Sequence, residues 1–296
     1  MDDQPVSREG DQDAKVVRSH VSYHLRTMAN EDGTEMNIYT VTISGADDGV
    51  DSQALEKLSA KYPFVEWGIL TSPKRIGQAR YPSKKWIEWM MNWSDAMRLS
   101  VHLCGDYSRD LLSKGKLTIA NDHPELFKAA NRMQINFPPM FPEPEFYHSL
   151  QLIYDKDIII QMNSFQANVA FANAKTEFKI PHVYPFHDSS GGRGYCWQQE
   201  APQYIDGCMN GFAGGLGPDN LREKIQELDE ALDEHHVIWL DMESNIRTDD
   251  KFDLEKVEAV LEIAEEFISP ETRAATYFET NAGQKRVSQR PPPGQD

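Results

Sequence analysis

Residues His182–Thr248 read HVYPFHDSSGGRGYCWQQEAPQYIDGCMNGFAGGLGPDNLREKIQELDEALDEHHVIWLDMESNIRT. Three times in this stretch a short apolar run ends in a polar or glycine-rich turn: VYPF precedes HDSSGGRG, CMNGFA precedes GGLGPDN, and VIWL precedes DMESNIRT. A repeated order of apolar run, turn and helical pattern is typical of βα units and a parallel sheet. The stretch therefore predicts an α/β fold whose functional groups follow the ends of strands.

The same pattern, followed outward, gives eight strand candidates. They are Ile38–Ser44, Phe64–Leu70, Arg98–Cys104, Arg132–Asn136, Asp157–Met162, His182–Phe186, Cys208–Ala213 and Val237–Asp241. Helical patterns cover Asp51–Tyr62, Ser83–Met97, Asp106–Lys114, Glu143–Tyr154, Phe165–Thr176, Pro218–Glu234 and Asp253–Ile268. Eight strand–helix units in about 230 residues match a closed (β/α)8 TIM barrel, with an open doubly wound sheet as the competing arrangement.

The composition of the two ends differs from that of the barrel region, 36–270. Residues 1–35 are charged and lack periodicity, so we expect a largely disordered N-terminal extension. Residues 271–296 end in PPPGQD, and we expect a flexible C-terminal tail.

The acidic balance and the few cysteines limit the partners. With 47 acidic and 30 basic residues the net charge is −17, which repels nucleic acid. No run approaches the ~18 apolar residues of a membrane span, and the N-terminus lacks an apolar signal core. Three scattered cysteines predict neither a disulfide framework nor a zinc site. We expect a cytoplasmic protein without cofactor or metal, whose oligomeric state stays open.

Three segments of the second half resemble, in order and spacing, the phosphoribosylanthranilate isomerase family, the TIM barrel of the tryptophan pathway. Phe186–Gly194 is similar to that family's strand-end aspartate and glycine-rich turn. Phe212–Asn220 is similar to its LAGGLNPDN-like segment, and Asp241–Arg247 to its DVSSGVE-like segment. Fainter similarities lie at Thr42–Gly45, Ala79–Ser83 and Met133–Asn136. The resemblance implies a barrel enzyme that isomerises a phosphorylated, ribose-type sugar by general acid–base chemistry.

One position departs from the family. Its catalytic base is the cysteine of a Lys-Ile-Cys-Gly segment, and this chain has Ser44 there and Thr42 in place of the lysine. An isolated hydroxyl needs a second base to activate it. His102 and Cys104, at the end of the third strand, are alternative bases if they face the barrel interior, and buried core residues otherwise. The activity of the tryptophan-pathway isomerase is therefore only one of the sugar-phosphate isomerisations that we consider.

The remaining site candidates follow the later strands. Asp188 is implied as the general acid that protonates the sugar ring oxygen, and the alternative is a turn cap on the amide of Gly191 or Gly192. Phosphate is expected at backbone N–H groups and hydroxyls after the sixth, seventh and eighth strands, at Gly192, Gly214, Gly215, Ser244 and Asn245. Each glycine is equally suited to an ordinary tight turn.

Substrate-binding candidates surround these groups. They are Arg80, Gln134, Asn136, Gln161, Arg193, Asp241, Glu243 and Arg247. Together with Arg75, the arginines in the loops would make a positive pocket for an anionic sugar, or else be solvated or ion-paired residues. Asp241 and Glu243, two residues apart, would face the same side of a strand.

Two other functions remain open. A barrel that lost its base but kept a phosphate cradle would be a non-catalytic phosphosugar- or nucleotide-binding protein. Asp241 and Glu243 with a divalent metal ion would instead suit a metal-assisted lyase or hydrolase.

Overall fold

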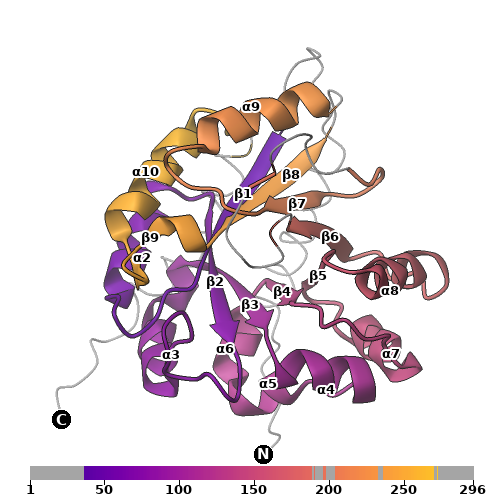
Figure 1. Cartoon of the computed structure of the whole chain (residues 1–296). Coiled ribbons are helices and arrows are strands. Elements are labelled where there is room, and N and C mark those ends of the chain that lie inside the picture. The colour runs from indigo at the N-terminus through magenta and orange to yellow at the C-terminus, as the bar shows by residue number, and fades with distance from the viewer. Residues whose placement is uncertain are drawn as a thin grey trace, which may run out of the picture.

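In the computed structural model, eight parallel strands close into a barrel in sequence order (Figure 1). The structure describes residues 37–188, 190, 196–197, 204–232, 236–269 and 272, so the two expected terminal extensions lie outside it, Thr272 apart. The strands are β1 (Asn37–Ser44), β2 (Val65–Thr71), β3 (Arg98–Leu103), β4 (Arg132–Ile135), β5 (Asp157–Gln161), β6 (Val183–Asp188), β7 (Asn210–Ala213) and β8 (Val237–Met242).

The predicted TIM barrel is confirmed, with every predicted strand present. Closure comes from β1 and β8, whose parallel register pairs Thr42 with Asp241 and Ile43 with Met242. This pairing excludes the open doubly wound sheet, because an open sheet leaves its two edge strands unpaired.

Helices surround the barrel (Figure 1). They are α2 (Ser52–Lys61), α3 (Lys84–Met90), the 3-10 helix η1 (Met91–Ala96), α4 (Asp106–Lys114), α5 (Thr118–Asp122), α6 (Pro124–Ala129), α7 (Pro144–Leu152), α8 (Phe165–Thr176), α9 (Leu221–Ala231) and α10 (Leu254–Glu265). After β8 come the 3-10 turn η2 (Ser244–Ile246) and a small hairpin of β9 (Arg247–Thr248) and β10 (Lys251–Phe252). Within the described ranges, no helix lies between β6 and β7, so the expected eight strand–helix units are not all seen.

The predicted helices have local physical causes. Asp51 accepts a hydrogen bond from the Gln53 N–H and begins α2, and Asp253 accepts from two N–H groups of the first turn of α10. Leu221, Ile225 and Leu228 form the buried face of α9. That helix begins at Leu221 rather than at Pro218, because the Asn220 side chain holds the preceding turn by accepting from the Gly217 N–H.

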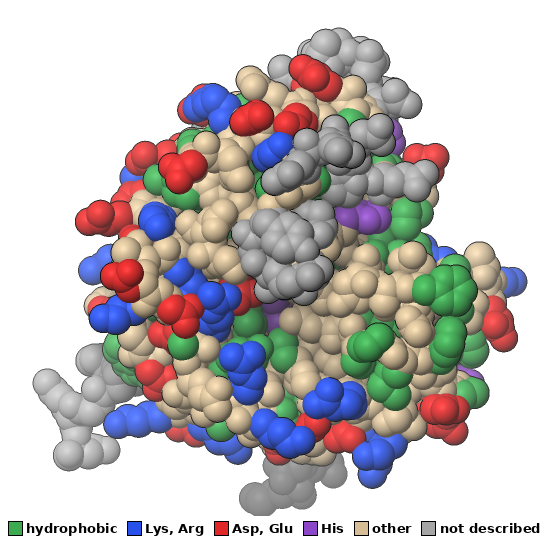
Figure 2. Space-filling model, in the orientation of Figure 1, with side chains coloured by type: hydrophobic (Ala, Val, Ile, Leu, Met, Phe, Trp, Pro, Cys, Tyr) green, Lys and Arg blue, Asp and Glu red, His purple; other side chains and the backbone are tan. Residues whose placement is uncertain are grey.

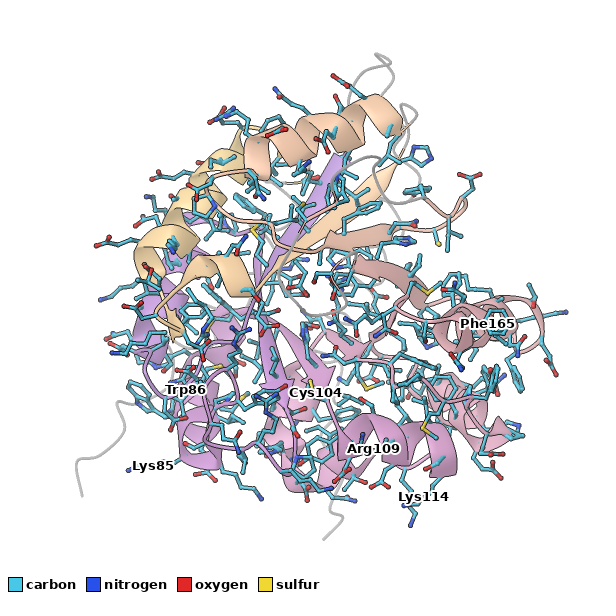
Figure 3. All side chains as sticks on the ribbon, in the orientation of Figure 1. Lys85, Trp86, Cys104, Arg109, Lys114 and Phe165 are labelled. Atoms are coloured by element: carbon cyan, nitrogen blue, oxygen red, sulfur yellow. The ribbon has the colours of Figure 1, made fainter. Side chains whose placement is uncertain are left out.

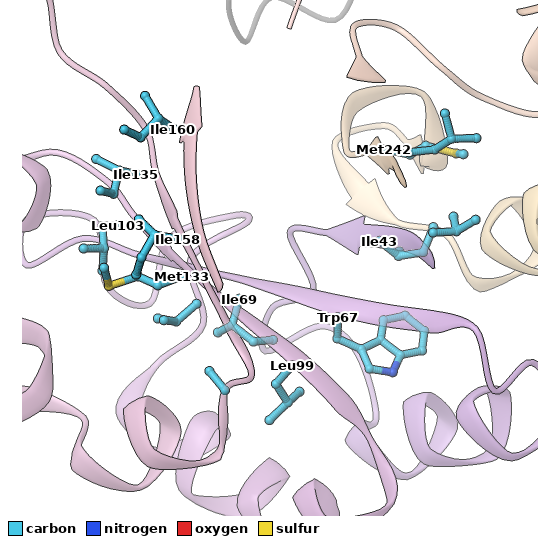
Figure 4. Packing of buried hydrophobic residues seen from close by; sticks show 14 of the residues in the cluster. Ile43, Trp67, Ile69, Leu99, Leu103, Met133, Ile135, Ile158, Ile160 and Met242 are labelled. Carbon is cyan, nitrogen blue, oxygen red and sulfur yellow. The ribbon is translucent and has the colours of Figure 1, made fainter. Parts of the chain in front are cut away.

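Alternation along the strands separates two packing layers. Side chains such as Val41 and Ile43 of β1 join a large apolar cluster with the helices, while Thr42 and Ser44 face the barrel interior. Figure 4 shows part of the outer layer, with Trp67, Ile69 and Leu99 among its labelled members. This layer fixes the strands and thereby the direction of every inward side chain.

The barrel interior contains both an apolar cluster and a group of buried polar side chains. Strands β5 to β8 contribute the apolar cluster Ile159, Tyr184, Phe186, Ala213 and Trp239. From β1 to β4 come buried polar groups that include Thr42, Glu66, Arg98, His102, Arg132 and Gln134.

A buried ion pair lies among these polar side chains. Nη1 of Arg132 donates to Oε1 of Glu66 at 3.0 Å, with side-chain exposures of 2% and 1%. The hydroxyl of Thr42 donates to the same carboxylate at 2.9 Å, and the Arg132 guanidinium lies 4.2 Å from the ring centre of Trp239. Removing one partner of such a pair leaves an uncompensated buried charge, so the pair is retained as a unit.

The outer surface mixes both signs of charge. On the face in Figure 2, acidic and basic side chains alternate rather than forming one acidic patch. None of the helices in the described part combines the length and apolar character needed to cross a bilayer.

Candidate active site

A cavity of about 80 Å³ lies at the carboxyl ends of the strands. Most of the predicted site residues line it: Ser44, Gln134, Asn136, Gln161, Asp188, Gly214, Gly215, Asp241, Glu243 and Ser244. Residues not predicted there are Phe186, Ser190, Ala213, Leu216 and Met242, and His102 is also present. The strand ends meet at one mouth, as parallel strands in a barrel require.

Asp241 and Ser44 form a buried pair on neighbouring strands. The Ser44 hydroxyl donates to Oδ1 of Asp241 at 2.8 Å, and Asp241 is 6% exposed. Burial raises the pKa of Asp241 well above its ordinary value, and the charges of Glu243, Glu66 and Asp188 add to this against the opposing bond from Ser44. Asp241 is therefore able to keep its proton well above the pH at which an ordinary aspartate ionises.

Asp188 is held differently. Its Oδ2 accepts from Nε2 of Gln161 at 2.9 Å, and its Oδ1 accepts from the N–H and hydroxyl of Ser190 at 3.0 and 2.8 Å. The turn-capping alternative is thus realised through Ser190, while Gly191 and Gly192 lie outside the described residues. Because Asp188 also lines the cavity, capping and contact with a ligand are compatible.

His102 faces the barrel interior because Gly68 of β2 has no side chain. A Cβ at Gly68 would lie 2.8 and 2.9 Å from Cε1 and Nε2 of His102 and would also overlap the Ser44 hydroxyl. Burial, helped by the charge of Arg132, lowers the pKa of His102 to about 3. The imidazole is therefore neutral at physiological pH and a weak base.

Cys104, labelled in Figure 3, follows the end of β3 and is buried beside Leu70 and Tyr81. Its sulfur accepts from Nδ2 of Asn136 at 3.1 Å, and Oδ1 of Asn136 accepts from Nε2 of Gln134 at 3.0 Å. Burial raises the pKa of the Cys104 thiol to about 12. A thiol that stays protonated at neutral pH does not act as the base that we considered, so its role here is to hold Asn136.

The turn after β7 presents backbone N–H groups to the cavity. Gly214 and Gly215 have φ of +115° and +61°, a conformation that favours glycine. The Gly215 carbonyl accepts from Nδ2 of Asn220 at 2.9 Å and from Nδ2 of Asn245 at 2.6 Å. The N–H groups of Gly214, Gly215 and Leu216 have no hydrogen-bond partner within the described ranges. Such a group of N–H donors suits an anion.

Asn245, an expected phosphate-binding residue, does not line the cavity, and its Nδ2 donates to the Gly215 carbonyl and so supports this turn. Ser244, its neighbour, does line the cavity.

Arg80 lies at the rim in two ion pairs. Its Nη1 donates to Oε1 of Glu243 at 2.7 Å and lies 3.3 Å from the Ser244 hydroxyl, and its Nη2 donates to Asp250 at 2.9 Å. Any contact of Arg80 with a ligand therefore competes with Glu243.

Arg247 is a correction to the expected substrate-binding set. It is buried away from the cavity, and its guanidinium donates to the Gly45 carbonyl, to Oδ2 of Asp47 and to the Asp250 carbonyl. It thus ties together the loops after β1 and β8, rather than pairing with Asp241 or Glu243. Neither Arg80 nor Arg247 lines the cavity. The Arg75 guanidinium carbon lies 4.4 Å from the ring centre of Tyr81, and Arg193 lies outside the described residues. The expected positive pocket is not formed by the described part of the chain.

Asp241 and Glu243 both line the cavity, although Glu243 follows the end of β8 and begins η2. Within the described ranges, no group of three or more His, Cys, Asp and Glu side chains is arranged to hold a metal ion. Oε1 of Glu243 is bound to Arg80, so the described residues do not provide a ligand set for the metal-assisted alternative.

The buried neutral His102 predicts sensitivity to acid. The unfolded chain protonates this residue near pH 6.5, whereas the folded chain resists protonation down to about pH 3. The free energy of unfolding should therefore fall as the pH drops below about 6.5, by roughly 2–3 kcal/mol at about pH 4.5 from this residue. Urea unfolding of the wild-type protein and of His102→Leu at pH 7.5 and 4.5 measures this fall in the free energy of unfolding. Equal losses in the two proteins would show that His102 is not responsible.

Comparisons with known proteins give structural similarity only. No protein-family model and no curated protein sequence matches this chain. Among solved structures, phosphoribosyl anthranilate isomerase from Thermococcus kodakaraensis is 13% identical, with a TM-score of 0.43 over 76% of this chain and 98% of that one. The N-(5'-phosphoribosyl)anthranilate isomerase of Pyrococcus furiosus is 15% identical, with a TM-score of 0.43 over 77% of this chain and 98% of that one. A phospho-2-dehydro-3-deoxyheptonate aldolase from Thermotoga maritima is 11% identical, with a TM-score of 0.41 over 78% of this chain and 68% of that one.

Proposed function

We propose that this chain is an enzyme that isomerises a phosphorylated sugar by general acid–base catalysis at the C-terminal mouth of its barrel. The observation that carries the proposal is the pair of carboxyl groups in unlike environments on one cavity. Asp241 is buried with a raised pKa, whereas Asp188 is fixed by three hydrogen-bond donors. Two carboxyl groups in such different surroundings suit a proton donor and a proton acceptor.

The geometry supports Asp241 as the donor and Asp188 as the acceptor better than the acid role expected for Asp188. Asp241 gives its proton to the sugar carbonyl oxygen while Asp188 removes the proton of the adjacent carbon, forming an enediol. Asp188 then returns that proton to the former carbonyl carbon, and the hydroxyl proton of the other carbon passes to Asp241. Both carboxyl groups are restored, and the carbonyl has moved by one carbon.

Ser44 has a supporting part in this scheme. Its hydroxyl donates to Oδ1 of Asp241 and fixes the carboxyl group at the cavity wall. A hydroxyl that already donates to a carboxyl group is poorly placed to remove a proton from carbon, so we do not assign Ser44 as the base.

The phosphate group is assigned to the rim formed after β7 and β8. Gly214, Gly215 and Leu216 line the cavity there together with Ser244, and their N–H groups have no hydrogen-bond partner among the described residues. Backbone N–H groups can hold phosphate without a cation in contact. The carboxyl groups deeper in the cavity would repel the phosphate, which favours its place at the rim.

The test follows proton abstraction in heavy water. Ribose 5-phosphate, N-(5'-phosphoribosyl)anthranilate and unphosphorylated ribose are incubated with the protein in D2O, and the proton at C2 is followed by NMR. We expect exchange of this proton with a phosphorylated sugar, lowered by roughly 10²–10⁴-fold in Asp188→Asn. Binding without exchange would favour the non-catalytic phosphosugar-binding protein. Exchange with ribose as fast as with its phosphate would remove the phosphate assignment.

A further inference from the structure

Two buried polar atoms on the cavity floor have no hydrogen-bond partner within the described ranges. They are Nε2 of His102 and Oε1 of Gln134. The two residues pair in register on β3 and β4, and they are 2% and 3% exposed. Buried polar atoms in folded proteins nearly always have a partner, so two on neighbouring residues that both line the cavity point to a group that binds there.

Both atoms are fixed by their surroundings. The His102 ring reaches over Gly68, where no Cβ is present to block it. Nε2 of Gln134 is used by Asn136, whose own amide donates to the sulfur of Cys104. With these bonds in place, Oε1 of Gln134 is the atom of the side-chain amide that remains to accept a hydrogen bond.

The chemistry of the pair selects an uncharged ligand group. Gln134 offers an acceptor, and a neutral imidazole with hydrogen on Nε2 offers a donor. A hydroxyl group both accepts and donates, so it satisfies both atoms at once. A carboxylate or phosphate only accepts, and it would face the Gln134 oxygen without a hydrogen between them.

We propose that His102 and Gln134 form a subsite for a hydroxyl group of the substrate, at the end of the sugar opposite to its phosphate. The proposal rests on the proposed function for the identity of the ligand as a sugar phosphate. Each of the two residues lies one position inside the end of its strand, whereas the N–H groups of Gly214 and Gly215 follow the end of β7. A pentose 5-phosphate held at the rim by its phosphate therefore presents C1 and C2 to the floor.

Calorimetric titration with ribose 5-phosphate and 2-deoxyribose 5-phosphate tests this assignment in the wild-type chain. A missing hydroxyl leaves both floor atoms without a partner, so ribose 5-phosphate should bind roughly 10–100-fold more tightly. Gln134→Leu and His102→Leu should each reduce this ratio to less than about 3-fold, chiefly by weakening the binding of ribose 5-phosphate.

Ser100→Ala is the matched control. Ser100 lies on β3 one inward position deeper than His102 and is fully buried. Its hydroxyl also lacks a partner among the described residues, but Ser100 does not line the cavity. This variant should keep the wild-type ratio. Equal binding of the two sugars by wild type would overturn the hydroxyl subsite and leave the phosphate rim in place. A preference that survives in both floor variants would also overturn it, and binding of neither sugar would overturn the proposed function as well.

Discussion

Asp241→Asn is expected to slow the isomerisation by roughly 10²–10⁴-fold, because the proposed proton donor is removed. The same change should stabilise the fold. Burial raises the pKa of Asp241, so ionising this group costs the folded state more than the unfolded one. Its contribution is fully favourable below the ordinary pKa of about 4 and is lost as the pH rises through the folded-state pKa. The neutral amide avoids this loss, and we expect a gain on the order of 1–2 kcal/mol at neutral pH.

Thermal and urea unfolding between pH 4 and pH 8.5 measure the gain, which should be near zero at about pH 4 and grow with pH. Asp253→Asn is the matched control, because Asp253 caps α10 and does not line the cavity. Its pKa is lowered, so its ionised form stabilises the folded state above the ordinary pKa of about 4. Asparagine still caps the helix, so this control should keep activity and lose a little stability at neutral pH, the opposite sign to Asp241→Asn. A destabilised Asp241→Asn protein at pH 8 would contradict the account, as would full activity in that variant.

The barrel could be predicted from the sequence because helices that pack on the outer side of the strands require apolar residues at the outward positions. Runs such as VIWL and DIII are apolar at the outward positions, and the carboxyl ends of parallel strands meet at one face. The short helices α5 and α6, of five and six residues, were missed because neither is long enough to show a helical period.

The arginine assignments depended on partners that no local pattern reveals. Arg247 pairs with Asp47, 200 positions away in the chain, and Arg80 pairs with Glu243 from another loop. Once these carboxylates are known, Arg80 is seen to be ion-paired at the rim of the cavity and Arg247 to be ion-paired in the loops. Sequence spacing alone leaves each of them a plausible ligand for an anion.

The sequence contains a signal for the position of the His102 side chain that we did not use. Gly68 interrupts the otherwise bulky strand VEWGILT, and a glycine in mid-strand often marks the close approach of another group. Alternation along β3 puts His102 on the inward side with Arg98 and Ser100. The two facts together predict an imidazole over the glycine, which is where the structure has it.

Gly211→Ala is expected to destabilise the protein by roughly 3 kcal/mol, lowering the melting temperature by about 10 °C. Gly211 lies on β7, and an added Cβ would overlap the Trp239 indole, reaching 2.7 Å from its Nε1. Trp239 is fully buried and cannot move aside easily. Its ring stacks on Phe186 with centroids 6.1 Å apart, and Arg132 lies over it at 4.2 Å. Urea unfolding of the single variant measures the loss.

A double-mutant cycle separates this clash from any general effect of alanine in a strand. Trp239→Phe removes the second ring of the indole, so adding Gly211→Ala to it should cost much less than in wild type. Alanine by itself lowers the entropy of the unfolded chain and would slightly stabilise a site with free space. If Gly211→Ala costs the same in both backgrounds, the indole is not what excludes a side chain at position 211, and the interior packing of β5 to β8 would have to differ from that described.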